Sequence, residues 1–172
     1  MARAANTPRR RYDAPKRGGV GKIYTSGKVD ISFAGPEHRT YRVDLMIDGI
    51  EHGGPSYRGF VFLNNPKATE KTPRDLENGY AGVFDIFAHG GCMGDPGHCE
   101  VNEHKREVYD FRNPNPLTPA RKRVTVTATI REIAKKAKTA TVTIVPVITA
   151  VNSLCETDDV FKCEELSFVA YN

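Results

Sequence analysis

The sequence predicts an all-β protein: an antiparallel Greek-key β-sandwich of about seven strands, preceded by a disordered basic N-terminal tail. Apolar and polar residues alternate with a period of two along most of the chain, which is typical of strands with one buried face. Turn-rich segments separate these runs, as in sandwiches with Greek-key links. The chain shows no strand–helix alternation of the kind that predicts a parallel sheet.

Seven segments carry the strand pattern. They span residues 21–33, 40–50, 57–63, 80–88, 122–131, 139–149 and 164–171. In the fifth, Val124, Val126, Ala128 and Ile130 alternate with threonines, which predicts a strand with one face in the core. Residues 131–138 are too few for a stable isolated helix, so we expect one helical turn or a wide hairpin end there.

Length and charge divide the chain into a tail and one domain. The 172 residues, 39% hydrophobic and 27% charged, fit a single globular domain over residues 21–172 that needs no metal or disulfide to fold. Residues 1–17 carry six cationic side chains and one acidic side chain, Asp13. The net charge of +4 of the whole chain therefore comes from this tail. We expect residues 1–20 to be a disordered linker or solubilising end, with nucleic-acid contact by Arg9-Arg10-Arg11 the less favoured alternative.

No segment predicts secretion or membrane insertion. No apolar run approaches the roughly 20 residues that span a bilayer. The first arginines are followed by Tyr12-Asp13-Ala14-Pro15-Lys16 and not by the apolar stretch of a secretory signal. We therefore expect a cytoplasmic protein.

A loop over residues 89–120 is long enough to suggest a function, because long loops are uncommon inside compact domains. Soft sulfur and imidazole donors occur together there, which is the donor set of copper sites. The candidate ligands of a transient copper ion are His89, Cys92, Met93, His98, Cys99 and His104. Copper is the candidate cofactor, and the sequence establishes none.

The four cysteines leave three interpretations open. Cys92 with Cys99 and Cys155 with Cys163 form two local pairs that are candidate disulfides, although cytosolic disulfides are rare. A metal site is the second interpretation, but the spacing matches neither a zinc C-x-x-C pair nor the ligand order of a blue-copper centre. Free thiols in a polar loop are the third.

No catalytic constellation is evident. The chain has neither a G-x-S-x-G nucleophile motif nor a glycine-rich phosphate loop ahead of a helix. Asp44, Asp48, Asp85 and Glu100 have no spacing that pairs them as acid and base, and we expect such strand-flanking carboxylates to be solvated. We therefore assign no catalytic residue.

Three short motifs support a family resemblance. Residues 41–50 (YRVDLMIDGI) look like a strand entering an Ile-x-Gly-Ile turn, and residues 59–65 (GFVFLNN) look like a Lys-Phe-Asp-Val-(Phe/Tyr)-(Ile/Leu)-Asn strand. Residues 80–84 (YAGVF) look like a Phe-Ala-Gly-Ser-Phe strand, and residues 122–149 suit a threonine-rich strand and its successor. Over residues 40–150 the chain thereby resembles the C-terminal domain of plant-type polyphenol oxidases and related bacterial tyrosinases.

The resemblance implies an accessory role. It implies a sandwich like the third domain of haemocyanins, and a type-3 copper oxidase catalytic domain or chain as the partner. Such domains cover the dicopper site, keep the oxidase latent or help to deliver copper. The catalytic domain of that family needs six histidines in two helical blocks, whereas this chain has five histidines in all, so we expect no enzyme activity from it alone.

One departure from the family pattern leaves alternatives open. The loop over residues 89–104 stands where the family has a Val-Pro-His-like continuation, and no family role maps onto it. The alternatives to an accessory domain are a standalone copper-binding protein of the cupredoxin type and a structural interaction module. In each case the chain is a possible oligomer, and the sequence does not give the oligomeric state.

Overall fold

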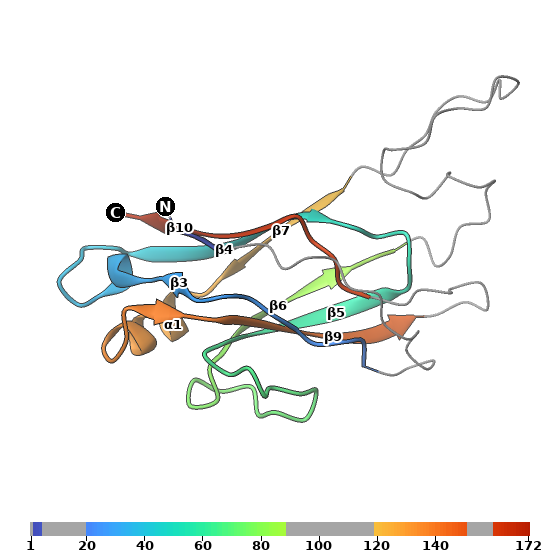
Figure 1. Ribbon diagram of the computed structural model, residues 1–172, viewed down its shortest axis with the longest axis horizontal. Helices are drawn as coiled ribbons and strands as arrows, with labels where there is room; N and C mark the ends of the chain where they lie inside the picture. Colours follow the sequence, from blue (N-terminus) through green and yellow to red (C-terminus); the bar gives the residue numbers. More distant parts are fainter. Residues whose placement is uncertain (1, 5–19, 89–118, 151–159) are drawn as a thin grey trace, which may run out of the picture.

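The computed structural model describes residues 2–4, 20–88, 119–150 and 160–172. Within these ranges the chain forms strands and two short helices (Figure 1). In chain order they are β1 (Ala2–Ala4), β2 (Tyr24–Thr25), β3 (Val29–Asp30), η1 (Ser32–Ala34), β4 (Arg42–Ile50), β5 (Ser56–Leu63), β6 (Tyr80–Ile86), β7 (Ala120–Thr125), α1 (Thr127–Ala134), β8 (Thr139–Ala140), β9 (Val142–Ala150) and β10 (Glu165–Tyr171). No helix in these ranges is long and apolar enough to cross a membrane.

The strands form two four-stranded antiparallel sheets that face each other. Sheet A has the order β1-β10-β4-β7 and sheet B the order β2-β9-β5-β6, while β3 and β8 form a separate two-stranded ribbon (Figure 1). The consecutive strands β5, β6 and β7 are neighbours, with β6 contacting β7 across the edge between the sheets. Since β4 lies beside β7 and not beside β5, the order is that of a Greek key, as the sequence predicts.

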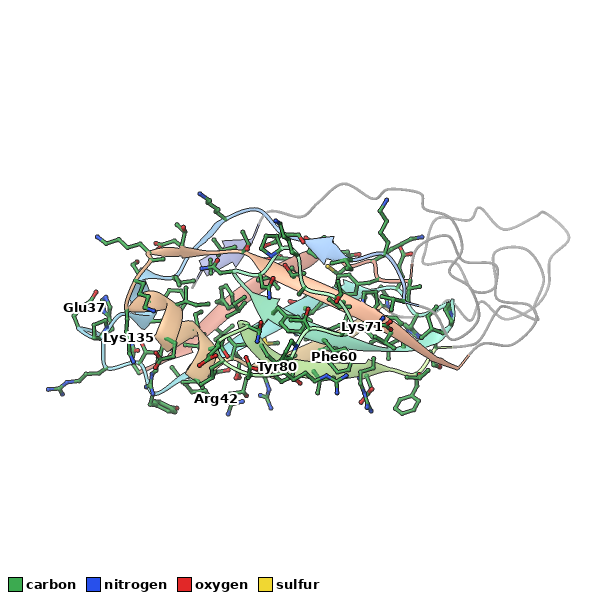
Figure 2. The ribbon with its side chains drawn as sticks, turned by 90° about the horizontal axis from the view of Figure 1, so that it is seen from below. Glu37, Arg42, Phe60, Lys71, Tyr80 and Lys135 are labelled. Carbon is green, nitrogen blue, oxygen red and sulfur yellow. The ribbon has the colours of Figure 1, made fainter. Side chains whose placement is uncertain are left out.

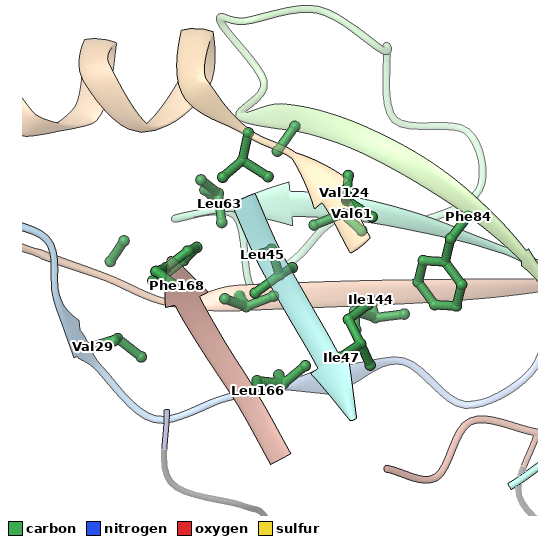
Figure 3. Packing of buried hydrophobic residues seen from close by; sticks show 14 of the residues in the cluster. Val29, Leu45, Ile47, Val61, Leu63, Phe84, Val124, Ile144, Leu166 and Phe168 are labelled. Carbon is green, nitrogen blue, oxygen red and sulfur yellow. The ribbon is translucent and has the colours of Figure 1, made fainter. Parts of the chain in front are cut away.

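The core lies between the two sheets. Sheet A contributes Leu45, Ile47, Val124, Leu166 and Phe168, all buried, and these side chains meet buried residues of sheet B in one cluster (Figure 3). Val43, Leu45 and Ile47 alternate along β4 with residues of the opposite face, which is the period-two pattern seen in the sequence. This alternation is the reason why the all-β fold could be predicted from the sequence.

A second apolar cluster covers the outer face of sheet B. Phe60, Phe62 and Val145 point away from the main core and pack under Ala68 of the loop over residues 64–79. The guanidinium of Arg74 from the same loop lies 3.9 Å from the centre of the Phe60 ring, and Figure 2 views the molecule from this side. Because both faces of its second half are covered, β5 has a continuous apolar run over residues 60–63.

The strand predicted over residues 122–131 is only half correct. β7 ends at Thr125, and residues 127–134 form the helix α1. Val126, Ile130, Ile133 and Ala134 recur at helical spacing and pack against the main core, whereas Ala128, expected to point inward, is exposed. Burying Ile130 completely contributes about 2–3 kcal/mol, enough to favour a helix too short to be stable alone.

The N-terminal part of the chain differs from expectation in two places. The single strand predicted over residues 21–33 is replaced by the two short strands β2 and β3, with η1 following. Residues 2–4, expected to be disordered, form β1 and pair antiparallel with β10. Residues 5–19 lie outside the described residues, so the disorder expected there stays a prediction.

Candidate interaction surfaces

The predicted copper ligands lie outside the part of the chain that the structure describes. This holds for His89, Cys92, Met93, His98, Cys99 and His104, and also for Cys155 of the second candidate disulfide. The described residues stop at Ala88, two residues after β6 ends, and resume at residue 119, immediately before β7. Among the described residues, no three His, Cys, Asp or Glu side chains form a group that could hold a metal ion.

Cys163 is the candidate disulfide cysteine that the structure describes. It is a free thiol that packs, partly buried, against the main core. Burial, together with the negative charges of Asp48 and Glu164, raises the pKa of Cys163 to about 12. The thiol is therefore protonated and unreactive near neutral pH. The pairing with Cys155 stays a prediction.

The end of β6 presents an apolar surface. Val83 and Asp85 lie on the outward face of β6, the edge strand of sheet B, and Phe87, just after the strand, continues this alternation. Phe87 is 87% exposed and Val83 41% exposed, while Asp85 forms an ion pair with Arg58 of β5. A phenylalanine so exposed contributes little hydrophobic free energy to folding.

A buried carboxylate organises the outward face of sheet A. Asp44 shares this face with Arg42 but is 0% exposed. Two nitrogens of Arg42 contact its two oxygens at 2.9 and 2.8 Å, and the hydroxyl of Thr125 on β7 donates a hydrogen bond at 2.9 Å. Nε of Arg123, also on β7, lies 3.7 Å from Oδ2. The expectation that Asp44 is solvated is therefore wrong.

The charge state of Asp44 follows from these contacts. Burial by itself would raise the pKa of the carboxyl group. The hydrogen bonds from Arg42 and Thr125 and the positive charges of Arg42 and Arg123 outweigh burial, so the pKa lies below its ordinary value. Asp44 is therefore ionised at neutral pH. The same contacts raise the pKa of Arg42.

Two tyrosines continue this surface towards the end of sheet A. Tyr171 of β10 lies opposite Arg42 of β4, and the guanidinium carbon of Arg42 is 5.4 Å from the centre of the Tyr171 ring. The Tyr41 ring, 64% exposed, is 6.3 Å from that of Tyr171. Figure 2 shows Arg42 at the periphery of the molecule. Sequence reasoning missed this surface because its members come from three strands far apart in the chain.

Comparison with known proteins finds structural likeness only. No family model matches the chain, and no curated protein sequence matches it. A recombinantly expressed latent aurone synthase, a polyphenol oxidase, is similar over 96% of the chain at 15% identity, with a TM-score of 0.49. The latent aurone synthase from a natural source is similar over 96% of the chain at 18% identity, with a TM-score of 0.48.

The chain spans 28% of the length of each of these two oxidases. Both are polyphenol oxidases, the family that the motifs of residues 41–88 resemble. A likeness at this identity and TM-score assigns no activity to the chain.

Proposed function

We propose that this chain is an accessory domain of a type-3 copper oxidase and has no catalytic centre of its own. The observation that carries the proposal is that the three resembling motifs lie on the consecutive strands β4, β5 and β6, and that the second and third are paired with each other. Gly59 of the second motif and Phe84 of the third are direct register partners on β5 and β6. Gly59 stands where the family pattern has Lys, and a Cβ atom there would lie 2.4 Å from the Phe84 ring, so this close contact is a departure from the family pattern.

A non-catalytic role agrees with the histidine content. A dicopper centre of this class requires six histidines in two helical blocks, and the chain has five histidines in total. α1, the one α-helix of the described ranges, has the sequence TATIREIA and contains no histidine. The copper ions would therefore be held by the partner.

The exposed end of β6 is the contact that we propose for the catalytic domain. Phe87 and Val83 give this face an apolar character, and the neighbouring Asp85 is neutralised by Arg58 at 2.7 Å. Aromatic side chains of this kind are enriched where protein surfaces meet. The expected counterpart is an apolar depression on the catalytic domain.

Binding and activation assays with a catalytic chain from the same genome, chosen for its two histidine blocks, test the proposal. The chain is expected to co-purify with it and to lengthen the lag before oxidation of a diphenol. Phe87→Ser should abolish both effects. Leu76→Ser is the matched control, since Leu76 is 51% exposed on the loop over residues 64–79. Absence of binding by the unaltered chain would refute the proposal, and an equal loss in both variants would refute the role of Phe87.

Copper delivery is the finer form of this proposal. It would use sulfur and imidazole donors between His89 and His104, a donor set that suits copper. Equilibrium dialysis of the reduced chain against Cu(I), followed by transfer to the metal-free oxidase, tests it. Failure to retain copper would leave a covering role alone.

A further inference from the structure

The two arginines and two tyrosines around Asp44 form one surface on sheet A, which we call the Arg–Tyr surface. It consists of Tyr41, Arg42, Arg123 and Tyr171, with Asp44 buried beneath them. Phe87 follows β6, the edge strand of sheet B, so the two surfaces belong to different sheets of the sandwich. A role for the Arg–Tyr surface therefore goes beyond the proposed function and does not depend on it.

The geometry holds Arg42 in place before any partner binds. Arg42 is fixed on one side by its two contacts with Asp44 and on the other by the Tyr171 ring. Arg123 contacts the same carboxylate. The side chains of Arg123 and Arg42 are nevertheless 58% and 37% exposed. Little conformational entropy therefore remains to be lost when Arg42 binds a ligand.

The charges of this surface do not balance. Among the described residues, Asp44 is the one carboxylate in contact with both guanidinium groups, which leaves one positive charge in excess. Elsewhere the described arginine pairs are one to one: Arg58 with Asp85 on sheet B, and Arg121 with Asp48 further along sheet A. Glu165 lies opposite Asp48, at the end of the face remote from Tyr171. The excess positive charge therefore lies around Asp44, where Arg42 and Arg123 share one carboxylate.

We propose that the Arg–Tyr surface binds an acidic peptide segment of a partner protein. A carboxylate can accept hydrogen bonds from guanidinium groups that still have free N–H donors, in the forked geometry that arginine favours. The tyrosine rings supply flat apolar area and a hydroxyl group beside it, and tyrosine and arginine are the residue types that dominate binding energy at interfaces. The buried carboxylate of Asp44 positions the arginines and does not itself meet the ligand.

A titration of the ¹⁵N-labelled full chain followed by NMR tests the proposal, with a hexaglutamate peptide as the probe. Saturable shifts are expected at the Nε–Hε signals of Arg42 and Arg123 and at the backbone amide of Tyr171. Arg42→Gln and Arg123→Gln should each weaken binding by at least about tenfold, and raising the salt concentration should weaken binding to the unaltered chain. Arg58→Gln is the matched control and should bind as the unaltered chain does, because Arg58 is paired one to one.

Further arms of the experiment make the outcome decisive. Tyr41→Ala replaces a side chain that is 64% exposed, so it should weaken binding without affecting folding. Hexalysine should not bind. Absence of saturable shifts, or equal weakening by Arg58→Gln, would overturn the assignment. Tighter binding of inorganic phosphate or of a single-stranded oligonucleotide than of hexaglutamate would overturn it as well, since that would indicate a general anion or nucleic-acid surface.

Discussion

Substituting Gly59 by alanine should destabilise the protein through the single contact with Phe84. The new Cβ atom would lie 2.4, 2.5 and 3.0 Å from three carbons of the Phe84 ring. Nonbonded carbons sit about 3.5–4.0 Å apart, so the ring would have to move by about 1 Å. Phe84 is buried and packs against the rings of Tyr57 and Phe161, at 6.3 and 6.1 Å, which oppose that movement. Overpacking of this kind costs about 1–3 kcal/mol.

Urea unfolding of a double-mutant cycle measures this effect. Gly59→Ala should lower the free energy of unfolding by about 1–3 kcal/mol, or the melting temperature by about 2–12 °C. Phe84→Ala should lower the free energy by about 3–5 kcal/mol. In the Phe84→Ala background the alanine at position 59 should cost almost nothing, because the atoms that it would strike are gone.

The control is Gly27→Ala, since a Cβ atom at Gly27 meets nothing within 4 Å and should change stability by no more than about 0.5 kcal/mol. If the effects of Gly59→Ala and Phe84→Ala add to within about 0.5 kcal/mol, the steric account is incorrect.

Three further outcomes are expected. Asp44→Asn should lower the free energy of unfolding by about 1–3 kcal/mol at neutral pH, because a hydrogen-bonded charge is lost. Folding lowers the pKa of Asp44, so the difference in free energy of unfolding between the two proteins should have its full size above about pH 4 and should decrease as the pH falls further. A difference that does not change with pH in urea titrations would contradict this expectation. Cys163 should react with iodoacetamide at pH 8 at least about a hundredfold more slowly in the native chain than in the unfolded chain, as followed by peptide mapping, and equal rates would disprove its burial. Ile130→Ala should cost about 2–5 kcal/mol, whereas Ala128→Lys should stay within about 0.5 kcal/mol because α1 exposes Ala128; a large cost at position 128 would favour the strand instead.

The strands that the sequence predicts most accurately are those whose pattern is local. Residues 40–50 were expected as a strand and form β4, and residues 164–171 were expected as a strand and form β10, each within two residues of the bounds observed. An alternation of apolar and polar residues shows which face of a strand is buried, and this can be recognised without knowledge of the rest of the chain. β5 was also found, although both faces of its second half are covered, because its apolar run is short and flanked by turns.

The segment after β7 shows where that reasoning fails. Residues 124–130 match a period of two, yet Val126, Ile130, Ile133 and Ala134 also match a period of 3.6. The two patterns share Val126 and Ile130, so the choice between strand and helix cannot be made locally. In the structure the hydroxyl oxygen of Thr127 accepts a hydrogen bond from the amide of Val43, and the hydroxyl of Thr129 donates one to the carbonyl of Tyr80. These contacts with distant strands favour the helix.

The composition and period of the sequence were by themselves sufficient to predict an all-β sandwich and most of its strands, because burial of alternate side chains is a property of each strand alone. The position of Asp44 was decided only by the tertiary structure. Its partner Thr125 is 81 residues away and reaches it because β7 pairs with β4 in one particular register. A shift of one residue would turn Thr125 to the other face of the sheet and remove the hydrogen bond. The Arg–Tyr surface exists for the same reason, since it requires β10, β4 and β7 to lie side by side in that order.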